Sequence, residues 1–428
     1  MTISKKPKVL VCTVDAWSSK TGADTFSSLL QRYGAENVAS LYIRADIADS
    51  TSASRYFQIV EGKVLRSIFN RSVTTGQEYK VGDLQEIPDL LEEKARYNSF
   101  RKHRWGIFLF AREFVWKMGR WKSKELNNFL DDFKPDVVIF PIEHFIHFNN
   151  ISEYIIKKCN PKVISFLWDD NFTYKQDPCN IWHLMHRWWC RKSVRRLVEL
   201  SDTVFALSPK MKEECDKEYH INSVLLTKPI FNQGDFVPYQ SRKPIRVLYT
   251  GNLLIERDKT IAAIAEGLRK INAVGVNVIL DIYTNTVLPQ PMIRRSTEGN
   301  FCSIHPPVSQ TDVFKLQKEA DILLFAESLD QKKHQDARLS FSTKITDYFR
   351  AGRCIWAVAS PTLGPMDYLM RMDAALISTD DATIYDVLKQ IVSSPDIICT
   401  YAEKGFNCGK KNHDGEKIIK TLHNAILN

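Results

Sequence analysis

Five residues in the second half of the chain could together hold a phosphate or diphosphate group. Gly251 ends a run of strand-forming residues, and a glycine at that position lets the backbone approach a phosphate closely. Arg257 follows six residues later, and Lys344 opens a predicted helix directly after Ser342 and Thr343. Cationic side chains and the backbone N–H groups of a helix start favour such an anion. The alternative is that Ser342 or Thr343 only caps the helix and that Lys344 is a solvated surface charge.

A second group of candidates lies in the first half of the chain. Asp169 and Asp170 come directly after an apolar run, where a carboxylate could accept a proton from a hydroxyl group or bind the hydroxyl groups of a ligand. Otherwise one of them caps the next helix. His144 lies just beyond a predicted strand that ends at Pro141 and is a further candidate, although a lone histidine is more often structural.

These residues follow the strands of a β/α pattern that occurs twice. Short apolar runs typical of strands buried on both faces occupy residues 8–14, 38–44, 135–140, 162–168 and 202–208, and then 245–251, 276–283, 301–305, 321–325 and 354–358. Residues 229–243, rich in proline and polar residues, indicate a linker between the two sets. The chain of 428 residues is too long for one ordinary core, so we predict two α/β domains with parallel, doubly wound sheets.

Four stretches carry a resemblance to a known family. Residues 201–211, 247–253, 320–325 and 341–352 resemble, in this order and spacing, segments of the retaining glycosyltransferase family 4, of the bacterial surface-polysaccharide type. The resemblance spans nearly the whole chain. It implies the GT-B fold, in which two Rossmann-like domains face a central cleft. The N-terminal domain, residues 1–230, would hold the acceptor and the C-terminal domain, residues 245–405, a nucleotide-sugar donor.

The resemblance also assigns residues to the donor site. Loop 18–24 resembles the glycine-containing loop under the donor phosphates, with Lys20 as a possible contact, unless it is only a tight turn. The donor-binding residues implied are Gly22, Gly251, Asn252, Arg257, Tyr283, Glu327, Ser342, Thr343, Lys344 and Asp347.

One motif departs from the family pattern. The second acid of the family's paired glutamates falls on Asp347, but Leu339 occupies the position of the first. Either that acid is absent, or Glu327 or Asp330 replaces it. Asp347 either binds the donor ribose through its carboxylate or pairs with Arg350.

The resemblance implies transfer of a sugar from a UDP- or GDP-linked donor to a glycan or to a lipid-diphosphate-linked acceptor in cell-surface polysaccharide synthesis, with retention and without a metal or other cofactor. Relatives carry a histidine near the transferred sugar, where this chain has Asp169 and Asp170, so these two and His144 are the catalytic candidates. A nucleotide-sugar epimerase and an inactive partner protein of a polysaccharide-synthesis complex remain alternatives. A Rossmann oxidoreductase is disfavoured because no GxGxxG motif follows either first strand.

Composition limits the remaining classes. The N-terminus has no signal-like apolar run, no stretch is long enough to span a bilayer, and nine cysteines without CxxC pairs favour a reducing compartment, so we expect a cytoplasmic protein. The net charge is +9, and residues 101–124 and 182–196 mix cations with tryptophan and phenylalanine. Such stretches suit an anionic membrane surface at the inner face of the plasma membrane, unless their aromatic residues are core. Nucleic acid is disfavoured because no binding module accompanies the charge.

The C-terminal residues 411–428 predict an amphipathic helix. Ile418, Ile419, Leu422 and Ile426 fall on one helical face. In the GT-B proteins that the chain resembles, this end of the chain packs back on the N-terminal domain.

Overall fold

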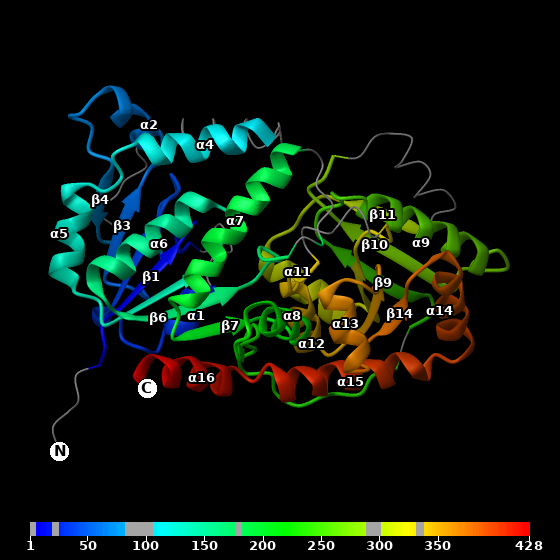
Figure 1. Cartoon of the computed structure of the whole chain (residues 1–428). Helices are drawn as coiled ribbons and strands as arrows, with labels where there is room; N and C mark the ends of the chain where they lie inside the picture. Colours follow the sequence, from blue (N-terminus) through cyan, green and yellow to red (C-terminus); the bar gives the residue numbers. More distant parts are fainter. Residues whose placement is uncertain are drawn as a thin grey trace, which may run out of the picture. The chain divides into compact units, whose positions relative to one another are not determined.

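The chain forms two compact α/β units (Figure 1). The computed structural model describes residues 6–18, 25–81, 106–173, 175, 181–240, 242–287, 301–330 and 338–428. Unit 1 consists of Met1–Leu207, Lys212–Leu226 and Ile419–Asn428, and unit 2 of Ser208–Met211 and Thr227–Ile418. Each unit has its own sheet, so the predicted fold class of two parallel-sheet domains is confirmed.

The sheet of unit 1 has its strands in the order β4-β3-β2-β1-β5-β6-β7-β8, and only the β3–β4 pair is antiparallel. The strands predicted from continuous apolar runs are present, whereas β3, β4 and β8 were not predicted. Their sequences are shorter or more polar, as in Gly76–Tyr79 with its central Gln and Glu. The strands are β1 Val9–Thr13, β2 Val38–Tyr42, β3 Arg55–Ile59, β4 Gly76–Tyr79, β5 Val137–Pro141, β6 Lys162–Leu167, β7 Thr203–Ala206 and β8 Val224–Leu225.

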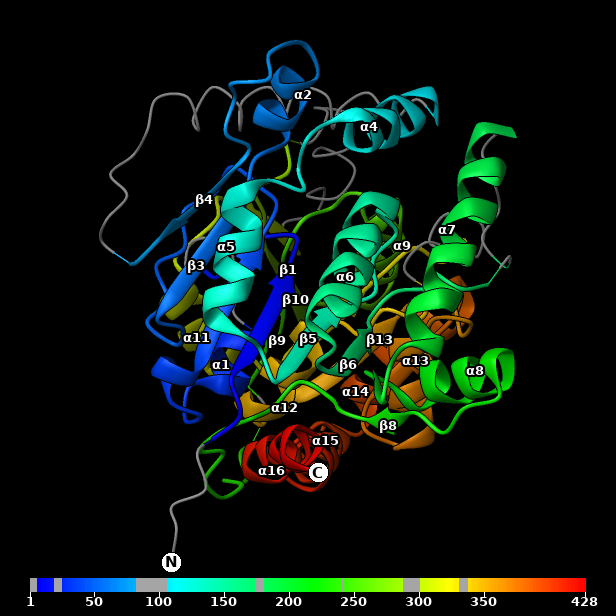
Figure 2. The same ribbon diagram turned by 60° about the vertical axis from the view of Figure 1, so that its left-hand side comes forward.

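Helices α5, α6 and α7 lie side by side along one face of this sheet (Figure 2). Helix α4 packs against α2, α6 and α7. None of the described helices of either unit is both long and apolar enough to cross a bilayer. The helices of this part of the chain are α1 Thr25–Leu30, the 3₁₀ turn Ala35–Asn37, α2 Glu61–Phe69, α4 Gly106–Met118, α5 Lys124–Phe133, α6 Ile146–Cys159, α7 Ile181–Glu199 and α8 Pro209–Tyr219.

Unit 2 has a fully parallel sheet in the order β11-β10-β9-β12-β13-β14. Of its strands only β14, three residues long, was not predicted. The strands are β9 Ile245–Thr250, β10 Val278–Tyr283, β11 Cys302–His305, β12 Ile322–Ala326, β13 Cys354–Val358 and β14 Leu376–Ser378. The helices are α9 Arg257–Ile271, α11 Gln310–Glu319, α12 Thr343–Ala351, α13 Gly364–Arg371, α14 Asp381–Ser393, α15 Asp396–Asn412 and α16 Gly415–Leu427.

The segment predicted as a linker, residues 229–243, packs along unit 2. Ile230 forms a parallel bridge with Asp414, and its N–H donates to the carbonyl of His413 at 2.7 Å. The side-chain amide of Gln233 donates to the carbonyl of Phe406 at 2.9 Å, and the Tyr239 hydroxyl donates to the carbonyl of Asp321 at 2.7 Å. This part of the chain is therefore bonded to helices and strands of unit 2.

Helix α16 has residues in both units, because Gly415–Ile418 group with unit 2 and Ile419–Asn428 with unit 1. Leu422 and Ile426 on its apolar face are almost fully buried, at 0% and 2% exposure. The ring of His423 lies 5.3 Å from the ring of Tyr33, both in unit 1.

Candidate functional site

The predicted phosphate-binding residues of unit 2 come together where β9 and β12 end and α12 begins. Gly251 follows the last residue of β9 and has a φ of +146°, a conformation that favours glycine. The ammonium group of Lys344 lies against it, since a Cβ added at residue 251 would be 2.2 Å from Lys344 Nζ. The same ammonium lies 4.8 Å from the ring centroid of Tyr249. Glycine at 251 therefore makes the space that Lys344 occupies.

Arg257, at the start of α9, faces the same edge of the sheet. Its Nε and one terminal nitrogen each donate to a carboxylate oxygen of Glu327 at 2.7 Å, a bidentate pair, and its other terminal nitrogen donates to Asn252. Glu327 follows the last residue of β12, and both paired side chains are 17% exposed. The pair holds the guanidinium in one orientation, so Glu327 is placed to orient Arg257.

The start of α12 has amide groups that its cap residue does not bind. Ser342 is the N-cap residue, but its side chain makes no capping hydrogen bond. The side chain of Ser342 therefore does not cap the helix, as the alternative interpretation of this residue had it. Thr343, the first residue of the helix, is exposed. With Lys344 in the first turn, these N–H groups form a set of donors suited to an anion.

Lys344 has an unusual protonation equilibrium. Burial and the neighbouring charge of Arg257 lower its pKa to about 8, and Glu327 opposes that shift in part. Within the described ranges, no residue accepts a hydrogen bond from Lys344 Nζ; its contact is the face of the Tyr249 ring. A bound diphosphate would supply the missing negative charge and raise the pKa again.

We therefore expect diphosphate binding to take up a proton near pH 8. At that pH about half of the free protein has an uncharged Lys344, so binding should take up roughly half a proton, and affinity should fall as the pH rises further. Calorimetric titration of UDP or GDP in two buffers of different ionisation enthalpy measures this uptake. Lys344→Arg, which stays charged, should abolish it. Equal heats of binding in both buffers for the unsubstituted protein would refute the assignment.

Two other predicted donor residues lie near this cluster. The N–H of Gly251 donates to the carbonyl of Tyr283 at 3.0 Å, and the Tyr283 ring stacks on His305 with centroids 4.6 Å apart. Asp347 lies on α12, 44% exposed, with its carboxylate 3.4 Å from the ammonium of Lys228. Its predicted alternative partner, Arg350, instead lies over the ring of Phe314.

Gly22 and Lys20 lie outside the described residues.

The catalytic candidates of unit 1 have different surroundings. Asp169 is partly buried just after β6. Asp170 is fully buried: its carboxylate accepts hydrogen bonds from the N–H and hydroxyl of Thr173 and lies 3.5 Å from a nitrogen of Arg187. These bonds give Asp170 the role of a turn-forming residue. The side chain of His144 is 49% exposed and packs on Phe145.

The residue that sequence reasoning missed is Glu143. It follows β5 directly before His144, and Trp168 Nε1 donates to its carboxylate at 3.3 Å. Burial and the nearby charge of Asp169 raise its pKa to about 7. Asn149 holds its backbone, accepting from its N–H at 3.1 Å and donating to its carbonyl at 2.8 Å. A carboxyl group with this pKa is suited to general acid–base catalysis. Glu143 could have been found from the sequence because, like Asp169, it lies just after a strand that is predicted to be buried.

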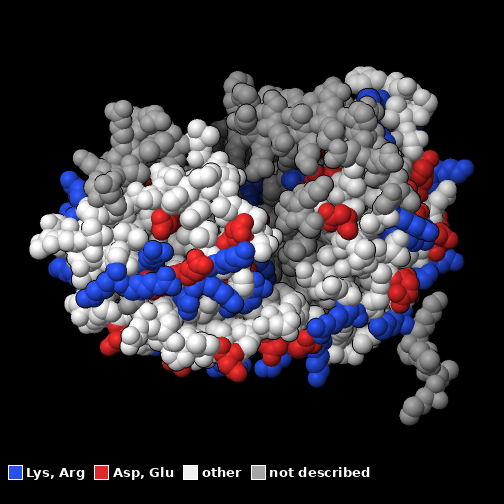
Figure 3. Space-filling view, turned by 180° about the vertical axis from the view of Figure 1, so that it is seen from behind, with Lys and Arg blue, Asp and Glu red and all other residues white. Residues whose placement is uncertain are grey.

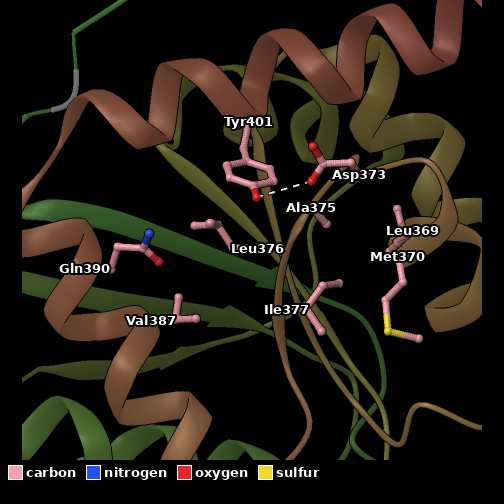
Figure 4. A pocket seen from close by; sticks show the side chains of 9 residues that line it. All are labelled: Leu369, Met370, Asp373, Ala375, Leu376, Ile377, Val387, Gln390 and Tyr401. Carbon is pink, nitrogen blue, oxygen red and sulfur yellow. Dashed lines mark hydrogen bonds between the residues drawn. The ribbon is translucent and has the colours of Figure 1, made fainter.

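A separate cavity of about 310 Å³ lies in unit 2 (Figure 4). Its lining includes Asp373, Ala375 and Leu376, at the amino end of β14. The hydroxyl of Tyr401 donates to the Asp373 carboxylate at 3.3 Å across it. Because the sheet is parallel, this is the edge opposite to Gly251 and Glu327, so the cavity is distinct from the candidate site.

Within the described ranges, no group of three or more His, Cys, Asp or Glu residues is arranged to hold a metal ion.

Comparison with solved structures finds the same fold in several proteins. A crystal structure of the Anabaena HepE protein in complex with UDP matches with a TM-score of 0.62 and 9% identity, covering 98% of this chain and 99% of that one. A trehalose-6-phosphate synthase from Burkholderia multivorans matches with a TM-score of 0.59 and 10% identity, covering 99% and 96%. A glycosyltransferase from Rickettsia africae matches with a TM-score of 0.57 and 10% identity, covering 99% and 100%.

No family model and no curated protein matches the sequence. The structural likeness, at identities near 10%, defines the fold, and the chain has the GT-B architecture. The resemblance to glycosyltransferase family 4 in particular stays a prediction.

Proposed function

We propose that this protein transfers a sugar from a nucleoside-diphosphate sugar, with UDP or GDP as the nucleotide, to a hydroxyl group of an acceptor. The observation that supports this most is the cluster at the carboxyl ends of β9 and β12, where Lys344 lies against Gly251 and Glu327 orients Arg257. Ligands of doubly wound sheets bind at this edge. The presence of UDP in the Anabaena structure with the same fold supports the choice of donor.

In the proposed reaction, these residues stabilise the leaving group. The bond between the sugar and the diphosphate breaks, and negative charge develops on the departing phosphate oxygen. The acceptor hydroxyl oxygen forms the new bond to the same sugar carbon, and its proton passes to the departing phosphate. Lys344 and Arg257, together with the first N–H groups of α12, are oriented before the reaction and stabilise that charge. This arrangement supplies the cations without a metal ion, and we propose a metal-independent transfer with retention of configuration at the sugar.

The acceptor is proposed to bind to unit 1. The carboxyl groups of Glu143 and Asp169 follow neighbouring strands of one sheet and would bind the acceptor hydroxyl groups, with His144 beside them. We propose a glycan or a lipid-diphosphate-linked glycan as the acceptor, in the synthesis of a cell-surface polysaccharide. The proposed location is the cytoplasmic side of the plasma membrane, where a lipid-linked acceptor would be presented.

A thermal-shift screen with UDP, GDP, ADP, CMP and dTDP tests the donor assignment. A ligand that binds only the folded protein raises its stability by about 2.7 kcal/mol at a concentration of 100 times its Kd. We expect UDP or GDP to raise the melting temperature in a concentration-dependent way, and the corresponding monophosphate to raise it less. If none of the diphosphates changes the melting temperature, the proposed donor site is wrong.

Incubation with the matching nucleotide sugar then distinguishes the alternatives. Transfer to an added glycan acceptor supports the proposal. Isomerisation of the sugar without an acceptor would identify an epimerase, and binding without any turnover would identify an inactive partner protein.

A further inference from the structure

Three helices of unit 1 carry an apolar surface that none of the described residues covers. All four aromatic side chains among the exposed large apolar residues of the described chain lie on α2, α4 and α7: Phe69, Phe114, Trp182 and Trp188, each 43% to 85% exposed. Leu65, Met118, Ile181, Leu184 and Met185 on the same helices are also exposed. We call this surface the aromatic face.

The three helices meet at one end of unit 1. In Figures 1 and 2, α2, α4 and the amino-terminal half of α7 lie at the same end, and α4 packs against both of the others. A shallow apolar groove of about 450 Å³ runs between α4 and α7, lined by Phe110, Leu184, Met185, Trp188 and Trp189. Ring contacts hold its aromatic walls together, with Phe110 stacked on Trp189 at 6.4 Å.

Two tryptophans predicted for such a surface are not part of it. Trp116 is buried and stacks on the ring of His147 at 4.7 Å, and Trp121 is buried. These two side chains are core, because they lie on the side of the chain that faces α6. Trp116 and Trp121 are therefore excluded from an exposed aromatic rim, whereas Phe114, for which a core position was the alternative, is 61% exposed.

Cations lie on the same helices as the aromatic face, and five of the nine Lys and Arg residues there pair with carboxylates: Arg112 with Glu61, Arg187 with Asp170, Arg191 and Arg195 with Glu218, and Arg196 with Glu153. The three helices contain three Glu residues. Of these glutamates, Glu113 is buried and accepts hydrogen bonds at the start of α6, and Glu61 pairs with Arg112. Lys117 and Lys192 are exposed, and the ammonium of Lys192 lies 3.7 Å from the ring centroid of Trp188. In the view of Figure 3, Lys and Arg also lie interspersed with Asp and Glu.

We propose that the aromatic face binds the surface of an anionic phospholipid bilayer. Tryptophan and phenylalanine side chains enter the boundary between headgroups and acyl chains, while lysine and arginine side chains beside them attract the negative headgroups. The surface is broad and apolar, and the exposed cations Lys117 and Lys192 lie on its helices, which is the combination that an anionic bilayer surface favours. The inference deepens the proposed function by placing the acceptor side of the enzyme at the membrane, and it rests on that function only for the identity of the acceptor.

Co-sedimentation of the full-length protein with vesicles, without nucleotide, tests the proposal. Vesicles of equal parts phosphatidylcholine and phosphatidylglycerol should bind the protein, and vesicles of phosphatidylcholine alone should bind it much more weakly. Phe114→Ala with Trp188→Ala should lower the partition coefficient roughly tenfold or more. Lys117→Ala with Lys192→Ala should lower it roughly fivefold for each cation removed.

Matched substitutions in unit 2 are the controls. Val274→Ala removes a fully exposed apolar side chain, and Lys259→Ala with Lys270→Ala removes two exposed cations, so none of these should change binding. Absence of binding to the anionic vesicles, or equal binding by the aromatic-face variants, would overturn the proposal. The proposal would also be overturned if the same variants disrupted a dimer, or a complex with added RNA, and still bound the vesicles.

One further variant separates this inference from the proposed function. Lys344→Ala is expected to lose donor affinity but to bind vesicles as the unsubstituted protein does. If the donor site is wrong, the vesicle result still stands, and if the membrane proposal is wrong, nucleotide binding is unaffected.

Discussion

Replacing Lys344 by alanine is expected to weaken UDP or GDP binding roughly 10- to 150-fold. The substitution removes one charge-assisted contact with the diphosphate, worth about 1.5–3 kcal/mol. The binding of the nucleoside monophosphate should suffer less, because it presents fewer negative oxygens. Calorimetry with both nucleotides measures the two losses. The protein itself should stay folded, because the ammonium is paired only with the face of Tyr249 among the described residues.

Two further substitutions make this prediction specific to the geometry. Gly251→Ala would place a Cβ 2.2 Å from the Lys344 ammonium at a strained φ of +146°, so it should displace Lys344 and weaken diphosphate binding while the charge remains. Arg257→Ala should have a similar effect on binding, and it also leaves Glu327 without its bidentate partner. Lys259→Ala on the same helix is the control, since Lys259 is exposed and pairs with Glu256. Unchanged diphosphate affinity in both Lys344→Ala and Gly251→Ala would show that the site lies elsewhere.

The second large effect is expected from the carboxyl-terminal helix. Leu422→Ala and Ile426→Ala each remove a side chain that is almost fully buried, and such substitutions typically cost about 2–5 kcal/mol of unfolding free energy. We expect unit 1 to lose the stability, because residues from Ile419 onward group with it. Hydrogen exchange should increase around Tyr33, whose ring contacts His423.

Leu427→Ala is the matched control on the same helix, because Leu427 is 60% exposed and its removal should cost less than about 0.5 kcal/mol. Deletion after Lys411 is a blunter test. It also removes His413, whose ring nitrogen lies 2.9 Å from the hydroxyl of Tyr368 in unit 2. Increased exchange confined to unit 2 in the Leu422→Ala protein would contradict the assignment of α16 to unit 1.

Much of the fold could be predicted because buried parallel strands have a plain signature. Strands such as Ile322–Ala326 are continuous apolar runs, and each was found from that pattern. Strands β4 and β8 could not be predicted in this way, because Gly76–Tyr79 is half polar and Val224–Leu225 has only two residues. The proline and polar residues of segment 229–243 predicted a linker. Composition does not reveal that Gln233 and Tyr239 form hydrogen bonds with unit 2.

The candidate site was predicted in part for a similar reason. Gly251 and Lys344 are far apart in the sequence, but one ends a strand and the other begins a helix, and this topology brings such positions to one edge of a sheet. The pairing of Arg257 with Glu327 depends on side-chain directions, which periodicity does not encode. Glu143 was missed because its pKa comes from burial beside Asp169, and burial of a residue in a loop is a tertiary property.

The division of α16 between two units has a consequence for synthesis of the chain. A ribosome completes Leu226 and must then add all of Thr227–Ile418 before it reaches the last residues of unit 1. At about 5–20 residues per second this delay is roughly 10 to 40 s. During that time the part of unit 1 that contacts α16 is without its partner, while unit 2 is still emerging. Nascent unit 1 is therefore a candidate for chaperone binding, which ends when Leu422 and Ile426 dock.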